Sequence, residues 1–294
     1  LFFSSFHIGT IAFFVTLAVG LTGFVVTKLR QLNVKSIPEY YELRFNKNVR
    51  VLGAIILVLG GVLNMGLFLK IGAMFIQGVF DLHSEFHLTI IMLGLLILVL
   101  TYTISGGMIS VIITDYIQFV VLSIGMLIAV YYSIKSIGWS NIFLFIEMND
   151  HGKNVYNPFI SKGGYYISWQ IILGFVSAVV WPTAITRILS LKSADIVKKQ
   201  YIWSSFSFLI RFIVPAFIGI CAFIYMSNAS IENDLLLMPI YLSEILPQGV
   251  LGLVVAGMLA AFMSTHDSYL LCWSSIITND IIEPLAGKKI SSRK

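Results

Sequence analysis

The stretch VLGLVVAGML, residues 250–259, is apolar throughout, and AAFMSTHDSYLLCWSS, residues 260–275, follows it directly. Residues 264–268 of this segment are five polar residues in a row. A soluble domain carries roughly 25% charged residues, whereas this chain of 294 residues carries 11%, with 58% hydrophobic residues and a mean hydropathy of +0.91. Because the chain lacks the polar residues needed to cover a core in water, we expect this segment to be a helix in a lipid bilayer.

Further apolar stretches of similar length occur along the whole chain. A helix needs about 20 apolar residues to cross a hydrocarbon core of about 30 Å. Helices are expected because lipid offers backbone groups no partners, and the stretches are too long and continuous for the alternating strands of a membrane barrel. The sequence therefore predicts an all-α polytopic membrane protein with about seven transmembrane helices, at roughly 1–27, 51–79, 88–105, 108–134, 167–187, 201–226 and 249–282. A short helix on the outer face is expected within 227–248.

Lysine and arginine concentrate in three segments, 28–50, 187–199 and 288–294, which hold 14 of the 19 basic residues. With seven spans, these segments fall on the same side of the membrane. Cytoplasmic loops carry the excess of basic residues, so we expect the N-terminus outside and the C-terminus in the cytoplasm of a multi-pass plasma membrane protein. The net charge of +5 then reflects topology, and no nucleic-acid partner is expected.

Four ionisable residues remain at membrane depth: Lys70, Asp115, Arg211 and Asp267. A charge at the centre of a lone helix costs about 2.5–3.5 kcal/mol on insertion scales, and such residues often mark an ion or substrate path. For Lys70 and Arg211 an interhelical salt bridge is an equally good interpretation. Asp115 and Asp267 are expected at comparable depth, where they would form an anionic pocket if their helices touch.

A stripe of small and hydroxyl-bearing residues runs along 261–268. Ala261, Ser264, Thr265 and Ser268 stand at helical spacing on one face, and Asp267 lies beside them. Hydroxyl, carbonyl and carboxylate oxygens are the ligands that hard cations prefer, and a serine or threonine can disturb the helical bond of a nearby carbonyl such as that of Ala261. The alternative is that both hydroxyls only bond back to their own helix.

The sequence does not favour an enzyme. Ser264 or Ser268 would need a histidine on another helix, yet His7, His83, His87 and His151 are expected near the outer face, and His266 points away from the stripe. The two cysteines, Cys221 and Cys272, lie in apolar runs and are expected to be buried thiols. No loop resembles the selectivity filter of a channel.

Four stretches resemble motifs of the sodium/solute symporter family, which includes sodium/glucose, proline, pantothenate, iodide and sialic acid transporters. They are SIPEYYELRF, YTISGGMISVIITDYIQ, TRILSLKSADIVKK and EILPQGVLGLVVAGMLAAFMSTHDSYLLCWSSIITNDI, in the family's order. The resemblance implies a LeuT-type inverted-repeat transporter that works by alternating access. It also implies that residues 1–294 are a single, incomplete transporter domain with core helices 2 to 8, core helix 1 and the helices after core helix 8 being missing.

The resemblance also implies a sodium site. The helix 8 half of the main site maps onto Ala261, Ser264 and Thr265, and core helix 1 would supply the other half. A second sodium or proton site maps onto Asp115, Asp267 and Ser268 together with Ser264, although Asp267 replaces a serine found in some members.

The implied function is sodium-coupled symport of a small organic solute across the bilayer. Trp181 and Thr183 stand where sugar carriers have an asparagine and a tyrosine, so no sugar is predicted. Pro182 is expected to break its helix near mid-membrane, as transporter sites often require, and Lys70 could attract a carboxylate. A transport-inactive sensor of the same fold and a proton-coupled symporter remain as alternatives.

Overall fold

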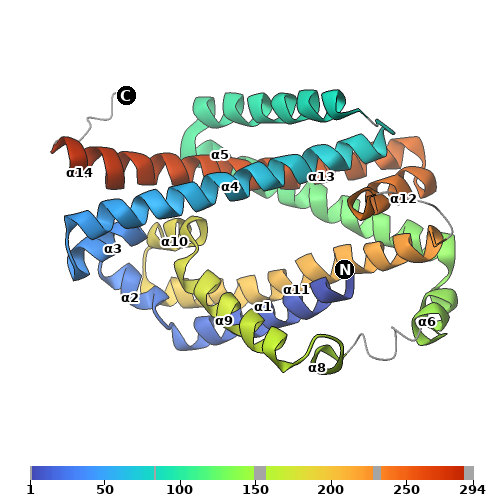
Figure 1. The fold of residues 1–294 in the computed structure, drawn as a ribbon, viewed down its shortest axis with the longest axis horizontal. Coiled ribbons are helices and arrows are strands. Elements are labelled where there is room, and N and C mark those ends of the chain that lie inside the picture. Colours follow the sequence, from blue (N-terminus) through green and yellow to red (C-terminus); the bar gives the residue numbers. More distant parts are fainter. Residues whose placement is uncertain (1, 83, 149–156, 228–232, 288–294) are drawn as a thin grey trace. The chain divides into compact units, whose positions relative to one another are not determined.

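A computed structural model describes residues 2–82, 84–148, 157–227 and 233–287, and all regular structure within these ranges is helical (Figure 1). The predicted all-α class is confirmed. The elements are α1 (Phe2–Thr22), α2 (Val26–Gln31), α3 (Ile37–Arg44), α4 (Lys47–Val79), α5 (Glu85–Ile137), α6 (Trp139–Met148), α8 (Pro158–Ser161), α9 (Gly164–Val180), α10 (Pro182–Leu189), α11 (Ala194–Tyr225), η1 (Asp234–Leu236), α12 (Leu237–Ile245), α13 (Gln248–Ile276), the π-helical turn η2 (Ile277–Ile282) and α14 (Glu283–Ala286).

Five helices in the described ranges are long and apolar enough to cross a membrane, and a sixth span results if α9 and α10 count as one bent span. Of the seven predicted segments, 1–27 is the one that this count does not include. Residues 1–27 contribute α1, whose 21 residues (Phe2–Thr22) reach about 32 Å at 1.5 Å per residue, enough for a hydrocarbon core of about 30 Å. The five helices are Lys47–Val79, Glu85–Gly106, Val111–Ile137, Ala194–Tyr225 and Gln248–Ala286.

Helix α5 contains two of these spans in one run of 53 residues. A straight helix of that length would measure about 80 Å, far more than one bilayer core of about 30 Å. The two segments predicted at 88–105 and 108–134 are thus both helical, as expected, without a non-helical loop between them.

The chain divides into two compact units. The first comprises the residues up to Thr10, Leu67–Gln170 and Phe208–Thr265, and the second comprises Ile11–Gly66, Ile171–Ser207 and the residues from His266 onward. Each unit has two buried apolar clusters of its own. The largest cluster of the first unit surrounds Tyr241 of α12, which is fully buried, so the helix predicted within 227–248 exists and packs on the core.

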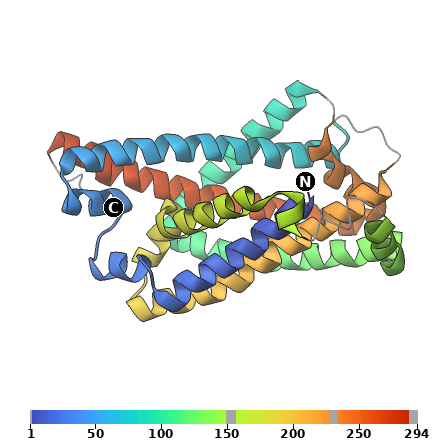
Figure 2. The ribbon, with the colours of Figure 1, turned by 60° about the horizontal axis from the view of Figure 1, so that its bottom comes forward.

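Helix α4 packs closely on α13 in each unit, and both views trace the two helices side by side (Figures 1 and 2). In the second unit, a Cβ atom on Gly61 would lie 2.1 Å from the ring of Trp273. In the first unit, a Cβ atom on Gly72 would lie 2.7 Å from the ring of Phe262. Glycine at these two positions lets aromatic rings of α13 lie directly on the α4 backbone.

Candidate functional site

The predicted oxygen stripe forms in the first unit. Ser264 Oγ donates a hydrogen bond to the Ala261 carbonyl at 3.1 Å, and Thr265 Oγ1 donates to the same carbonyl at 2.9 Å. Both hydroxyls thus bond back to their own helix, which is the alternative that the sequence left open. The same geometry brings three oxygen atoms to one point on α13, and all three residues are half-buried. This cluster has the chemistry of a partial shell for a hard cation.

A tyrosine of α5 contacts α13 beside this cluster. The Tyr102 hydroxyl donates a hydrogen bond to the Met263 carbonyl at 3.1 Å, within the first unit. Sequence reasoning quoted Tyr102 as part of the YTISGG motif but gave it no role. The contact explains why a tyrosine suits this position: its ring spans the distance between two helices, and its hydroxyl fixes the segment that carries the stripe.

The other charged candidates of the first unit are Asp115, Lys70 and Arg211. Asp115 is half-buried on α5, and Lys70 is exposed on α4. The Arg211 guanidinium lies over the Phe208 ring at 5.3 Å. Asp267 belongs to the second unit, so the expected neighbourhood of Asp115 and Asp267 stays a prediction, as do the solute and salt-bridge roles considered for Lys70.

A polar relay connects α10 to α13 in the second unit. The Arg187 guanidinium donates through Nη2 to Ser268 Oγ, and Ser268 Oγ donates to Asp267 Oδ1 at 3.2 Å. Asp267 is fully buried, with 0% of its surface exposed. Sequence reasoning counted Arg187 only as a topology charge and missed this contact, because 81 residues separate it from Ser268.

Helix α10 begins where Pro182 breaks the chain's helical path. The axes of α9 and α10 differ by 41°, and Trp181 between them is extended, as expected for a residue that precedes proline. Proline lacks the N–H that would bond to the Ala178 carbonyl. The Tyr201 hydroxyl donates to that carbonyl instead, at 2.6 Å, so one backbone group freed by the break is satisfied by the protein.

Side chains at this break contact α13. The Trp181 ring packs edge-on against the Tyr269 ring with centroids 6.2 Å apart. Thr186 Oγ1 lies 3.5 Å from the Cys272 thiol. Thr183 is half-buried on α10. Of the two predicted solute candidates, Trp181 therefore contacts an aromatic ring of α13.

His266 and Tyr269 join α13 to α4 in the second unit. His266 Nε2 lies 3.2 Å from the Met65 carbonyl, which can only accept, so Nε2 carries the proton. The Tyr269 hydroxyl donates to Asn64 Oδ1 at 3.1 Å. His266 is 1% exposed, so it faces α4 as a packing residue and does not face solvent.

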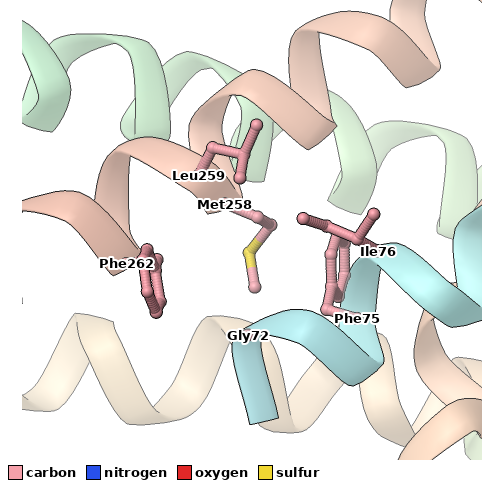
Figure 3. Close-up of a pocket in the computed structure, with 6 residues that line it drawn as sticks. All are labelled: Gly72, Phe75, Ile76, Met258, Leu259 and Phe262. Atoms are coloured by element: carbon pink, nitrogen blue, oxygen red, sulfur yellow. The ribbon is translucent and has the colours of Figure 1, made fainter. Parts of the chain in front are cut away.

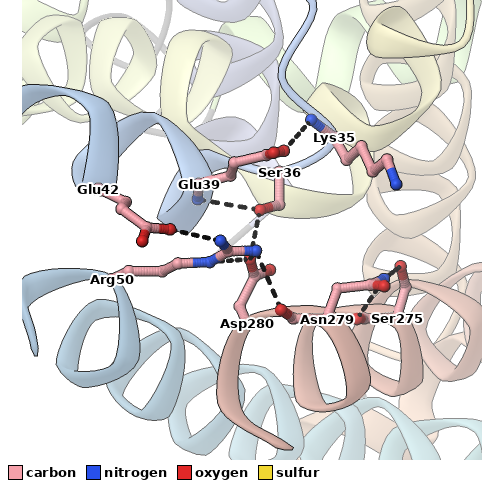
Figure 4. A network of polar contacts seen from close by, with 8 residues as sticks. All are labelled: Lys35, Ser36, Glu39, Glu42, Arg50, Ser275, Asn279 and Asp280. Atoms are coloured by element: carbon pink, nitrogen blue, oxygen red, sulfur yellow. Dashed lines mark hydrogen bonds and ion pairs between the residues drawn. The ribbon is translucent and has the colours of Figure 1, made fainter. Parts of the chain in front are cut away.

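A second polar cluster surrounds Arg50 at the start of α4 (Figure 4). Its guanidinium donates to Asp280 Oδ1 through Nε at 2.8 Å and contacts the same atom through Nη2 at 2.7 Å. It also donates to the Asn279 carbonyl at 2.9 Å and pairs with Glu42. Ser36 donates to Asp280 Oδ1 at 2.9 Å. Arg50 thus joins Ser36 and Glu42 of SIPEYYELRF to Asn279 and Asp280 of the TND segment, so the cluster gives both motifs a structural role.

The same cluster starts helix α3. Ser36 Oγ accepts from the Glu39 N–H at 3.1 Å, and the Glu39 carboxylate accepts from the Lys35 N–H, an arrangement close to a capping box. The Tyr41 ring of α3 lies against Gly53 of α4, and burial raises the pKa of Tyr41 above its usual value. Helix α3 is thus capped at its N-terminus by Ser36 and Glu39, and it packs on α4 through Tyr41.

The first unit also contains a small pocket between α4 and α13 (Figure 3). Its lining consists of Gly72, Phe75, Ile76, Met258, Leu259 and Phe262. No side chain with a nitrogen or oxygen lines it, so it has none of the groups that orient a polar solute or hold an ion.

The long apolar helices define a helical membrane protein. The Sodium:solute symporter family matches residues 1–294, and the chain belongs to that family. It is 25% identical over 283 residues to the sodium/glucose cotransporter of Vibrio parahaemolyticus, covering 84% of this chain and 50% of the relative. It is 25% identical over 266 residues to sodium/proline symporter 2 of Staphylococcus saprophyticus, covering 86% of this chain and 49% of the relative.

A solved structure shares the fold. A Na+-coupled sialic acid symporter in a substrate-bound, outward-open state matches with a TM-score of 0.83 at 21% identity, over 99% of this chain and 64% of that chain. The predicted LeuT-type fold is confirmed, and the chain is a transporter-family member and not an enzyme. The chain spans about half the length of the curated relatives it matches.

Proposed function

We propose that the protein is a sodium-coupled symporter of a small organic solute that works by alternating access. The Ala261 carbonyl and the hydroxyls of Ser264 and Thr265 would supply the α13 part of its sodium site. The observation that carries this proposal is the convergence of the two hydroxyls on one carbonyl, at 3.1 and 2.9 Å. Hydroxyl hydrogens rotate freely, so both oxygens can turn their lone pairs to a cation.

Sodium would drive transport by favouring one conformation. A ligand shifts a conformational equilibrium only by its differential affinity for the two states. The energy source is the sodium gradient, to which a membrane potential adds about 2.3 kcal/mol per charge for each 100 mV. We place the basic segments 28–50 and 187–199 on the cytoplasmic side, and the described residues end before the third basic segment, 288–294.

For the solute, we propose contacts near the break between α9 and α10. Trp181 and Thr183 stand at this break, and Trp181 packs against Tyr269. An aromatic face with neighbouring hydroxyls suits a small molecule that has both apolar and polar parts. The relatives carry glucose and proline by name, so family membership leaves the solute open; Lys70 is our candidate for attracting a carboxylate.

Thermal unfolding of the intact purified protein in sodium or potassium chloride at equal ionic strength tests the sodium site. Binding to the native state stabilises it by about 2.7 kcal/mol when sodium is present at about 100 times its Kd. We expect a sodium-specific rise in Tm that Ser264→Ala and Thr265→Ala each reduce or abolish.

Ser274→Ala is the matched control. Ser274 lies on the same helix and bonds back to the Leu271 carbonyl at 3.1 Å, so it repeats the local geometry outside the cluster. Its variant should keep the full sodium effect. Absence of any sodium effect in the wild-type protein would overturn the proposal and favour a proton-coupled or non-transporting protein.

A further inference from the structure

The end of α1 and the start of α11 pack against each other in the second unit, and both views trace them side by side (Figures 1 and 2). A Cβ atom on Gly20 of α1 would lie 2.8 Å from the backbone nitrogen of Ile202. A Cβ atom on Gly23 would lie 2.6 Å from Cε of Lys198. Gly23 also has a φ of +70°, which glycine adopts at no steric cost. The turn after α1 therefore holds the stem of Lys198 against its backbone.

Two ammonium groups stand at this end of α11. Lys198 is half-buried, and Lys199 is exposed. Within the part of the chain that the structure describes, neither ammonium lies within 4.0 Å of a carboxylate oxygen. Residues 192–199 carry three lysines and one acid, Asp195. The two neighbouring lysines thus form a local positive charge with which no described carboxylate pairs.

Aromatic side chains continue this surface along the span. Trp203 stands one helical turn after Lys199 on the same face of α11, and it is 75% exposed. Its ring centroid lies 6.4 Å from that of Phe206, and the Phe206 ring meets Phe13 of α1 edge-on at 5.4 Å. Lys199 and Phe206 are about 10 Å apart along the helix, at 1.5 Å per residue. The surface is therefore positive at one end and aromatic along its length.

A phospholipid with an anionic headgroup matches both parts of this surface. The lysine stems can lie on apolar groups while their ammonium ends reach the headgroups, and tryptophan is enriched at the same level of the membrane. Anionic lipids give the cytoplasmic leaflet its negative surface potential, and we place segment 187–199 on that side. A water-soluble anion would contact the lysines but would gain nothing from the rings of Trp203 and Phe206.

We propose that Lys198, Lys199 and Trp203 form a binding site for an anionic phospholipid of the cytoplasmic leaflet. The two ammonium groups bind the headgroup, and an acyl chain follows the rings of Trp203 and Phe206. The site lies on α1 and α11, apart from the oxygen cluster of α13. It takes a lipid and not the transported solute, so it does not depend on sodium coupling.

Quenching of tryptophan fluorescence by brominated lipids tests the inference. The intact purified protein is reconstituted in phosphatidylcholine vesicles with increasing fractions of dibrominated phosphatidylglycerol or, in a parallel series, dibrominated phosphatidylcholine. The chain has five tryptophans, so the difference between the wild-type protein and Trp203→Phe isolates the signal of Trp203. We expect phosphatidylglycerol to bind beside Trp203 at least about fivefold more tightly than phosphatidylcholine, because each lysine near an anionic surface contributes about that factor.

Three double variants separate the lysine pair from net charge. Combining Lys198→Gln with Lys199→Gln should make the two brominated lipids quench Trp203 equally. Combining Lys198→Arg with Lys199→Arg keeps both charges and should keep the preference. Combining Lys35→Gln with Lys192→Gln removes two exposed charges from the same two basic segments and should also keep the preference.

Equal quenching of Trp203 by both lipids in the wild-type protein would overturn the inference, because it would show lipid contact without selection of the headgroup. Quenching by neither lipid would overturn it as well, because another part of the protein or a partner would then cover the surface. A preference that persists without both lysines would contradict their role. Because the wild-type preference is decisive alone, the test holds even if the glutamine variant does not fold.

Discussion

Replacing Arg50 with methionine should destabilise the protein more than any other single change in its polar cluster. The substitution keeps much of the side-chain volume but removes the guanidinium, which makes two contacts to Asp280 Oδ1 and one to the Asn279 carbonyl. Asp280 would keep only the hydroxyl of Ser36 while remaining 0% exposed. Removing one partner of a buried ion pair costs about 3–5 kcal/mol.

Two other changes in the same cluster should cost less. Asp280→Asn keeps an acceptor for Ser36 and leaves Arg50 with Glu42 as a counter-charge, so a loss of about 1–3 kcal/mol is expected. Glu42→Gln affects a side chain that is 36% exposed, and exposed ion pairs contribute about 0–1 kcal/mol. The predicted order of destabilisation is therefore Arg50→Met, then Asp280→Asn, then Glu42→Gln.

The assay is unfolding of the detergent-solubilised protein by heat or denaturant. Two quantities are measured during unfolding: the tryptophan fluorescence and the fraction of protein that remains monodisperse. Combining Arg50→Met with Asp280→Leu supplies the internal control, since replacing both partners of a buried pair by apolar groups is often neutral or stabilising. The double variant should recover most of the loss. If Arg50→Met costs no more than Glu42→Gln, the reasoning that the buried charge governs this cluster is wrong.

Two further predictions use adjacent or paired positions as controls. Gly61→Ala should destabilise the protein, because the new Cβ atom would lie 2.1 Å from the Trp273 ring. Gly60→Ala has no atom within 4 Å of the new Cβ and should stabilise the protein by about 0.4–1 kcal/mol. Unfolding midpoints of the two variants check this prediction, and equal shifts in the two midpoints would contradict the packing of Gly61 on Trp273. For topology, Lys35→Cys should react with a membrane-impermeant maleimide only from the cytoplasmic side, and Lys162→Cys only from outside. Both native cysteines are buried, so little background labelling is expected. Labelling of both variants from the same side would refute the proposed orientation.

Helical periodicity was sufficient to predict the oxygen stripe. Ser264 and Thr265 stand three and four residues after Ala261, and in a helix this spacing alone brings their hydroxyls to one carbonyl. The apolar runs likewise predicted the helices, since length and composition decide whether a segment can cross lipid. Pro182 also predicted the break between α9 and α10, whose axes differ by 41°, because proline cannot continue the hydrogen bonds of a helix.

Contacts between distant segments were not predictable from the same patterns. Arg50 meets Asp280 across 230 residues, and Arg187 meets Ser268 across 81 residues. Both arginines stand at the ends of apolar segments. The excess of basic residues in cytoplasmic loops was therefore a sufficient reason for their presence in the sequence. The three-dimensional structure shows two further contacts. Arg50 pairs with the Asp280 carboxylate, and Arg187 bonds to Ser268, which donates to Asp267.

The five polar residues of 264–268 cannot all serve one ion, because successive residues in a helix point about 100° apart. The structure divides them between neighbours. Ser264 and Thr265 gather at the Ala261 carbonyl, His266 bonds to α4, and Ser268 bonds to Arg187 of α10. The polar run thus consists of an oxygen cluster at Ser264 and Thr265, followed directly by residues that contact α4 and α10. This division is why a substitution at His266 should act through helix packing, whereas one at Thr265 should act through the ion.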